Sequence, residues 1–334
     1  MKKTFLYFCL LFIVQTAFAA DSLYVREQQI PILIDRIDNV LYEMRIPAQK
    51  GDVLNEITIQ IGDNVDLSDI QAIRLFYSGV EAPSRKGEHF SPVTYISSHI
   101  PGNTRKALES YSVRQDEVTA PLSRTVKLTS KQPMLKGINY FWVSIQMKPE
   151  TSLLAKVATT MPNAQINNKP INITWKGKVD ERHVGIGVRQ AGDDGSAAFR
   201  IPGLVTTNNG TLLGVYDIRY NSSVDLQEKI DIGVSRSTDK GQTWEPMRVA
   251  MTFKQTDGLP HGQNGVGDPS ILVDEKTNTI WVVAAWTHGM GNERAWWNSM
   301  PGMTPDETAQ LMLVKSEDDG KTWSRMNRVR NSRN

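Results

Sequence analysis

The stretch STDKGQTW at residues 237–244 returns as SEDDGKTW at residues 316–323. Both copies fit the pattern Ser-x-Asp-x-Gly-x-Thr-Trp, whose five specified positions arise by chance about once in ten thousand chains of this length. The pattern is typical of a corner between two strands: Ser and Asp oxygens accept hydrogen bonds from turn amides, Gly takes the positive φ, and Trp packs against the sheet. The repeat therefore predicts repeated β-sheet units and has a structural, not a catalytic, role.

One predicted hairpin lies before each copy of the repeat. The Asn-Asn-Gly turn at 208–210 separates strand-like residues 204–205 from 212–216, and Asn-Gly supplies the positive φ angles of a tight turn. A second hairpin joins 270–273 to 279–286 through a turn. Consecutive hairpins predict that residues 181–334 form successive β-sheets.

Residues 20–180 have the pattern of short strands. The run EITIQI at 56–61 alternates apolar and polar residues, and INYFWVSI at 138–145 is rich in β-forming residues. Long amphipathic helical stretches are absent, so we expect an antiparallel β-sandwich, with the domain boundary just before Val184. Aromatic residues such as Tyr77 or Tyr95 are candidates for a sugar-stacking surface, although packing in the core is the default for aromatics on strands.

A short stretch upstream of the first hairpin adds chemistry to this architecture. Phe199-Arg200-Ile201-Pro202 stands just before the first strand. Together with the repeat, which is the Asp-box or BNR repeat, it resembles bacterial sialidases (neuraminidases). The resemblance implies an all-β chain with an N-terminal β-sandwich, a candidate carbohydrate-binding accessory domain, followed by the first blades of a six-bladed β-propeller. It also implies retaining exo-hydrolysis of terminal sialic acids, with sialylated glycans as partners.

The resemblance assigns Arg200 to substrate binding, as the first of three arginines that hold the sialic acid carboxylate. A planar, permanently charged guanidinium forms paired hydrogen bonds with a carboxylate, which Lys does not reproduce. The alternative is an arginine paired with a surface acid.

The loop after the second strand of the hairpin carries the next candidates. Arg219 and Asp225 keep the six-residue spacing of the family's second arginine and its general acid/base. The resemblance therefore places Arg219 at the sugar's 4-position and makes Asp225 the catalytic residue that protonates the glycosidic oxygen and later activates water. Asp217 is the competing carboxylate, but its place within the strand favours a structural role.

The stretch GVGDPS at 265–270 resembles the family's next active-site loop, and this assigns Asp268 to substrate binding at the sugar's 4-position. The alternative is an Asx turn before a strand. Trp286, Trp296 and Trp297 follow, either as pocket lining or as core and lid packing.

In the sialidase family the tyrosine nucleophile, its glutamate and the other two arginines come from later blades. The segment from Phe199 to Asn334 fits about three blades of roughly 40–50 residues. Residues 324–334 show no strand alternation, so we expect a truncated or frame-shifted gene or a partial sequence. We also expect exposed sheet edges and little or no turnover from these residues alone.

The remaining features of the sequence limit the classes of function that the protein can have. A net charge of +2 gives no field of one sign for nucleic acid. Lys2 and Lys3 before an apolar run, with a small-residue site ending at Ala19, predict a signal peptide over 1–19 and a secreted or periplasmic protein with no membrane span. We expect no cofactor and no metal site, since no ligand spacing is present. The main alternative to an enzyme is a non-catalytic, adhesin-like glycan-binding protein.

Overall fold

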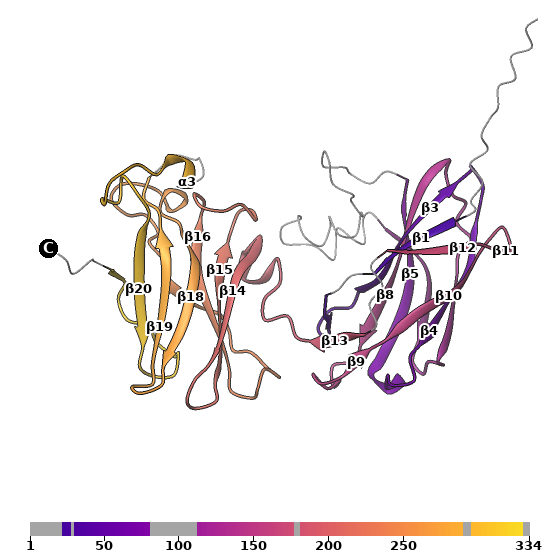
Figure 1. The fold of residues 1–334 in the computed structure, drawn as a ribbon, viewed down its shortest axis with the longest axis horizontal. Coiled ribbons are helices and arrows are strands. Elements are labelled where there is room, and N and C mark those ends of the chain that lie inside the picture. Colours follow the sequence, from indigo (N-terminus) through magenta and orange to yellow (C-terminus); the bar gives the residue numbers. More distant parts are fainter. Residues whose placement is uncertain (1–21, 28–29, 81–111, 177–180, 290–294, 330–334) are drawn as a thin grey trace, which may run out of the picture.

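The structure is a computed structural model, in which two groups of β-sheets follow one another along the chain (Figure 1). Their buried apolar side chains form two main clusters, one from Leu23 to Val184 and one from Leu213 to Val314. The predicted all-β class is confirmed. The signal peptide and Tyr95 fall outside the residues that the structure describes, which are 22–27, 30–80, 112–176, 181–289 and 295–329.

The first unit consists of strands and one 3₁₀ turn. They are β1 (Ser22–Glu27), β2 (Ile32–Leu33), β3 (Asn39–Ala48), β4 (Leu54–Ile61), η1 (Leu67–Asp69), β5 (Ile70–Gly79), β6 (Val113–Thr119), β7 (Thr125–Thr129), β8 (Gly137–Met147), β9 (Lys156–Val157), β10 (Thr159–Ile166), β11 (Lys169–Pro170), β12 (Asn172–Lys176) and β13 (Arg182–Gly185).

Two larger sheets enclose the core of this unit. A six-stranded sheet has the order β12-β1-β3-β8-β5-β6, and a four-stranded sheet has the order β11-β10-β4-β7. The predicted alternation in β4 is confirmed, because Ile57, Ile59 and Ile61 are fully buried in the core cluster. The expectation of a purely antiparallel sandwich is wrong at two pairs, since β1 pairs with β12 in parallel and β13 pairs with β2 in parallel.

Val184 and Gly185, the second half of strand β13, lie beyond the boundary expected before Val184, yet they pair with β2 of the first unit, as Arg182 and His183 pair with β9. Further along, the Gln190 side chain donates a hydrogen bond to Asp35 Oδ2 at 2.5 Å. By its hydrogen bonding, the first unit therefore extends through Gly185.

The second unit follows, with its elements in chain order. They are η2 (Asp193–Gly195), β14 (Ala198–Thr206), β15 (Leu212–Arg219), β16 (Ile230–Ser237), β17 (Arg248–Met251), η3 (His261–Gln263), β18 (Val266–Asp274), β19 (Thr279–Trp286), α3 (Ala295–Asn298), β20 (Gln310–Ser316) and β21 (Asn327–Arg328).

These strands form two four-stranded antiparallel sheets in sequence order, β14 to β17 and β18 to β21. Both predicted hairpins are confirmed as β14–β15 and β18–β19. We expected about three blades, whereas the described residues form two sheets, because each sheet with its connections, residues 198–251 and 266–328, is longer than the 40–50 residues expected for a blade. Although residues 324–334 show no strand alternation, Asn327 and Arg328 pair with β20. Successive up-and-down sheets of this kind are what adjacent propeller blades consist of.

The corner geometry predicted for the Asp-box is present in both copies. Ser237 Oγ accepts from the Gly241 amide at 2.8 Å, and Asp239 Oδ1 accepts from the Thr243 amide at 2.9 Å. The second copy repeats both bonds within 0.1 Å, at 2.9 and 2.8 Å. The final Trp323 packs against the core cluster of this unit.

These corner bonds stabilise ionised carboxylates. Hydrogen bonds from the side chain and amide of Thr243, then from Ser237, lower the pKa of Asp239 to about 2. At Asp318, partial burial opposes the shift, but hydrogen bonds from Thr322 and Ser316 prevail and the pKa is also about 2. Both turns therefore keep their charge well into the acidic range.

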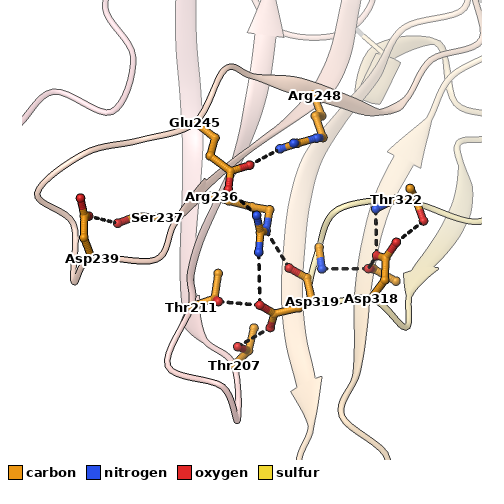
Figure 2. Close-up of polar contacts among 12 residues, drawn as sticks. Thr207, Thr211, Arg236, Ser237, Asp239, Glu245, Arg248, Asp318, Asp319 and Thr322 are labelled. Atoms are coloured by element: carbon orange, nitrogen blue, oxygen red, sulfur yellow. Dashed lines mark hydrogen bonds and ion pairs between the residues drawn. The ribbon is translucent and has the colours of Figure 1, made fainter.

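Asp319, next to the second Asp-box aspartate, ties the two sheets together (Figure 2). Its carboxylate accepts hydrogen bonds from Thr207 at 2.6 Å and Thr211 at 2.5 Å, which flank the β14–β15 turn of the other sheet. Arg236 on β16 donates to the Asp319 carbonyl at 2.7 Å and to its carboxylate at 3.2 Å. The corner of one sheet is thus anchored on a turn and a strand of its neighbour.

Candidate active site

Three of the predicted site residues meet at one end of the sheet formed by β14 to β17. Arg200 Nη1 lies 3.1 Å from Asp225 Oδ1, and Arg219 Nη1 lies 2.5 Å from the same oxygen. Both guanidinium groups also donate to the Ser223 carbonyl, at 3.1 and 2.9 Å. Arg200 lies on β14, Arg219 ends β15, and Asp225 stands in the loop that follows, so the hairpin and its loop bring the three together.

Burial differs sharply among these side chains. The Arg219 side chain is 1% exposed, whereas those of Arg200 and Asp225 are 43% and 32% exposed. Arg219 therefore belongs to the floor of the site, and the other two are accessible to a ligand.

Asp217 lies beneath Arg219 and is equally buried. Its Oδ2 accepts from Arg219 Nε at 3.1 Å and from Nη2 at 2.7 Å. Burial raises the pKa of Asp217 to about 6, although the hydrogen bonds and positive charge of Arg219 lower it. Sequence reasoning set this carboxylate aside as structural, and the structure places it in direct contact with a predicted site residue.

The fourth predicted residue, Asp268, reaches the cluster through its backbone. Its amide donates to Asp217 Oδ1 at 2.9 Å, while its side chain is exposed. The structure therefore connects Asp268 to Arg219 by way of Asp217.

A shared irregularity marks the first strand of both sheets. Ile201 has φ +54° and Asp268 has φ +56°, each directly before a proline. At both places the register of the sheet shifts, between Arg200 and Gly203 in β14 and between Gly267 and Ser270 in β18. Such bulges bend a strand and redirect its side chains. The left-handed residue occurs where each sheet presents its site residue.

Gln227 fixes the loop that carries Asp225, and sequence reasoning missed it. Its buried amide donates to the carbonyls of Thr287 and Gly289 at 3.0 and 3.1 Å. Its Oε1 accepts from Thr287 Oγ1 at 2.7 Å and from the Gly265 amide at 3.2 Å. Nothing in the sequence separates this residue from an ordinary polar loop residue, because its partners lie far along the chain, in the segments next to β18 and β19.

The structure divides the aromatic candidates into side chains buried in the core and one exposed side chain. Trp286 is 7% exposed and stacks on Phe253 with ring centroids 4.2 Å apart, so it packs in the core. Tyr77 is also buried and donates to Asn139. Trp297, on α3, is 69% exposed, and the side chain of Trp296 lies outside the described residues.

A separate groove of about 400 Å³ lies on the outer face of the six-stranded sheet in the first unit. Tyr24, 48% exposed, stands beside Arg45 on the neighbouring strand. Arg26 and Lys176 are paired in register and line the same groove with one acid, Glu43, which lies 3.7 Å from Arg26. The groove thus combines an aromatic face with an excess of positive charge.

Other classes of site find no support within the described ranges. There, no three His, Cys, Asp or Glu side chains are grouped so as to hold a metal ion. No helix in the described part of the chain is long and apolar enough to cross a bilayer.

Two comparisons with protein families cover most of the chain. Residues 20–170 match the N-terminal domain of BNR-repeat neuraminidase, and residues 201–334 match a BNR repeat-like domain.

Individual relatives agree with these matches. The chain is 56% identical to a sialidase of Bacteroides fragilis (strain YCH46) over 97% of its own length and 60% of that protein. It is 36% identical to a sialidase of Paraclostridium sordellii over 38% of its length and 28% of that protein. Among solved structures, Hadza microbial sialidase Hz136 matches with a TM-score of 0.78 and 59% identity, over 91% of this chain and 59% of that one. The chain therefore spans about 60% of the length of the Bacteroides relative.

Proposed function

Since the chain belongs to the family of BNR-repeat neuraminidases, we propose that it forms the accessory domain and the first part of the catalytic domain of an exo-α-sialidase. The reaction is retaining hydrolysis of terminal sialic acids from glycoproteins, glycolipids and oligosaccharides. The observation that carries the proposal is the contact of Arg200 and Arg219 with one oxygen of Asp225, at 3.1 and 2.5 Å.

Each group in this cluster suits a step of that reaction. The exposed guanidinium of Arg200 is available to pair with a substrate carboxylate, which competes with Asp225 for it. Asp225 is accessible to a glycosidic oxygen and is the carboxyl group proposed to protonate it. The exposed side chain of Asp268 provides a polar contact for a sugar hydroxyl, and Arg219, at the floor of the site, is the second substrate-binding candidate.

The test of this function is release of free sialic acid from 3′-sialyllactose. We would assay the 334-residue chain and a hybrid that adds the part of the Bacteroides fragilis sialidase that this chain does not cover. We expect the hybrid to release sialic acid with retention of the anomeric configuration, followed by proton NMR. A folded hybrid that binds sialyllactose without releasing sugar would instead favour the non-catalytic, glycan-binding function.

We further propose that the groove of the first unit binds the acidic end of a sialylated glycan. An aromatic face packs against the apolar face of a sugar ring. Arg26, Arg45 and Lys176 outnumber Glu43 in the groove and supply charge for a carboxylate. This is the accessory, carbohydrate-binding role for the β-sandwich.

Tyr24→Ala is expected to weaken binding of 3′-sialyllactose about two- to tenfold, since loss of an aromatic contact costs roughly 0.5–1.5 kcal/mol. Isothermal titration calorimetry on the full chain provides the measurement. Leu154→Ala, at an 89% exposed position of the same unit, is the matched control. Arg200→Ala distinguishes this groove from the candidate active site and should leave groove binding unchanged. Equal affinity for lactose and sialyllactose would rule out recognition of the acidic sugar.

A further inference from the structure

Asp217 is the one carboxylate in the described residues of the site whose two oxygens serve different sheets. Oδ2 accepts both bonds from Arg219 on β15, and Oδ1 accepts the amide of Asp268 on β18. The side chain is 1% exposed, so these contacts are made without competition from bulk water.

The bonds to Asp217 decide how Arg219 is oriented. They occupy Nε and Nη2, which is one edge of the guanidinium, and they direct Nη1 toward Asp225 and the Ser223 carbonyl. A guanidinium is planar and rigid, so fixing one edge fixes the other.

The same carboxylate holds the irregular backbone at Asp268. A non-glycine residue at φ +56° is disfavoured by local sterics and requires support from its surroundings. The bond from the Asp268 amide supplies part of that support. The Asp217 carboxylate also lies beside Gly267, where an added Cβ would be in ordinary van der Waals contact with both oxygens, at 3.5 Å.

We propose that Asp217 is a positioning residue that couples Arg219 and Asp268 into one recognition unit across the two sheets. Only a group with two buried acceptor oxygens does this. Asn has one acceptor oxygen, which serves Arg219 or the Asp268 amide but not both. The consequence for sugar binding rests on the proposed function, whereas the coupling itself does not.

The coupling is testable in the 334-residue chain by NMR, without turnover. The charged groups that face Asp217 are Arg219 on its own strand, Asp268 from β18, and Arg200, its register partner on β14. We expect the Arg219 Nε–H and the Asp268 amide to shift with one common midpoint near pH 6, because burial raises the pKa of Asp217 to about 6. Arg236 Nε–H, which bonds to a backbone carbonyl, is the control that should not show this midpoint.

Two variants keep the inference falsifiable. In Asp217→Asn both shifts with this midpoint should vanish. In Arg219→Met the chemical shift of the Asp268 amide should still change with pH. The midpoint of that change should move to higher pH, because the cation that lowers the pKa of Asp217 is gone. Different midpoints for the two signals in the unaltered chain, or an Asp268 amide that ignores Asp217→Asn, would overturn the proposal.

The catalytic consequence is measured separately in the hybrid enzyme. Asp217→Asn should raise KM for 3′-sialyllactose about tenfold or more, with a smaller loss of kcat, because it displaces groups that bind the sugar. A fall in kcat with unchanged KM would contradict the assignment to binding. If the NMR results hold while no enzyme releases sugar, the proposed function fails and the coupling stands.

Discussion

In the hybrid enzyme, Asp225→Asn should lower kcat on 3′-sialyllactose by roughly 10²–10⁴-fold, the range typical of general acid–base catalysis. Asn keeps the size of the side chain but provides no proton for the glycosidic oxygen. The loss should be much smaller on a 4-methylumbelliferyl sialoside, whose phenol-type leaving group departs with less proton transfer. Steady-state kinetics on both substrates give the comparison.

Glu275→Gln is the matched control for this change of charge. Glu275 lies in the turn between β18 and β19, at the end of the sheet away from the site, and is exposed. Its kinetics should equal those of the unaltered enzyme. Equal losses on the two substrates in Asp225→Asn would mean that Asp225 is not the proton donor.

The second large effect is on stability. Arg236→Met should lower the free energy of unfolding by about 3 kcal/mol, the low end for removing one partner of a buried ion pair. Arg236 is 4% exposed and bonds to both Asp319 and Glu245, so its loss leaves two acids without this cation (Figure 2). Urea denaturation measures the change, and hydrogen exchange should place the loss in β14–β21.

Arg248 provides a control within the same network. It bonds to Glu245 at 2.8 Å but is 38% exposed, so Arg248→Met should cost no more than about 1 kcal/mol. If the two arginine variants were equally destabilised, the network between the sheets would not carry the stability assigned to it.

Local patterns predicted most of the fold. Alternation identified β4, the Asn-Gly turn identified the first hairpin, and the Asp-box fixed both corners with the expected hydrogen bonds. Sequence gave no signal for the parallel pairs, because β1 and β12 are distant in the chain and β13 is only four residues long. Pairing between distant strands depends on the whole fold, which no short segment encodes.

The residues of the candidate site were predicted from the sequence, but one contact that connects them was not. The resemblance named Arg200, Arg219, Asp225 and Asp268, and the structure brings the first three into direct contact. The sequence did not predict that Asp217 links Arg219 to Asp268, because this link depends on the Asp268 amide, which lies in another sheet. Roles for these residues in binding and turnover stay predictions until the variants are measured.

The left-handed residue before a proline has a consequence for how this site is assembled. The two sheets use the same backbone bend at the same place but put different chemistry there, an apolar Ile201 beside Arg200 in one and an acidic Asp268 in the other. The groups assigned to the site are thus carried on a repeated main-chain shape, and this bend occurs once in the first strand of each sheet. The remainder of these two strands follows a regular ladder, so the repeated bend provides the frame, and the residues at and just before it provide the difference.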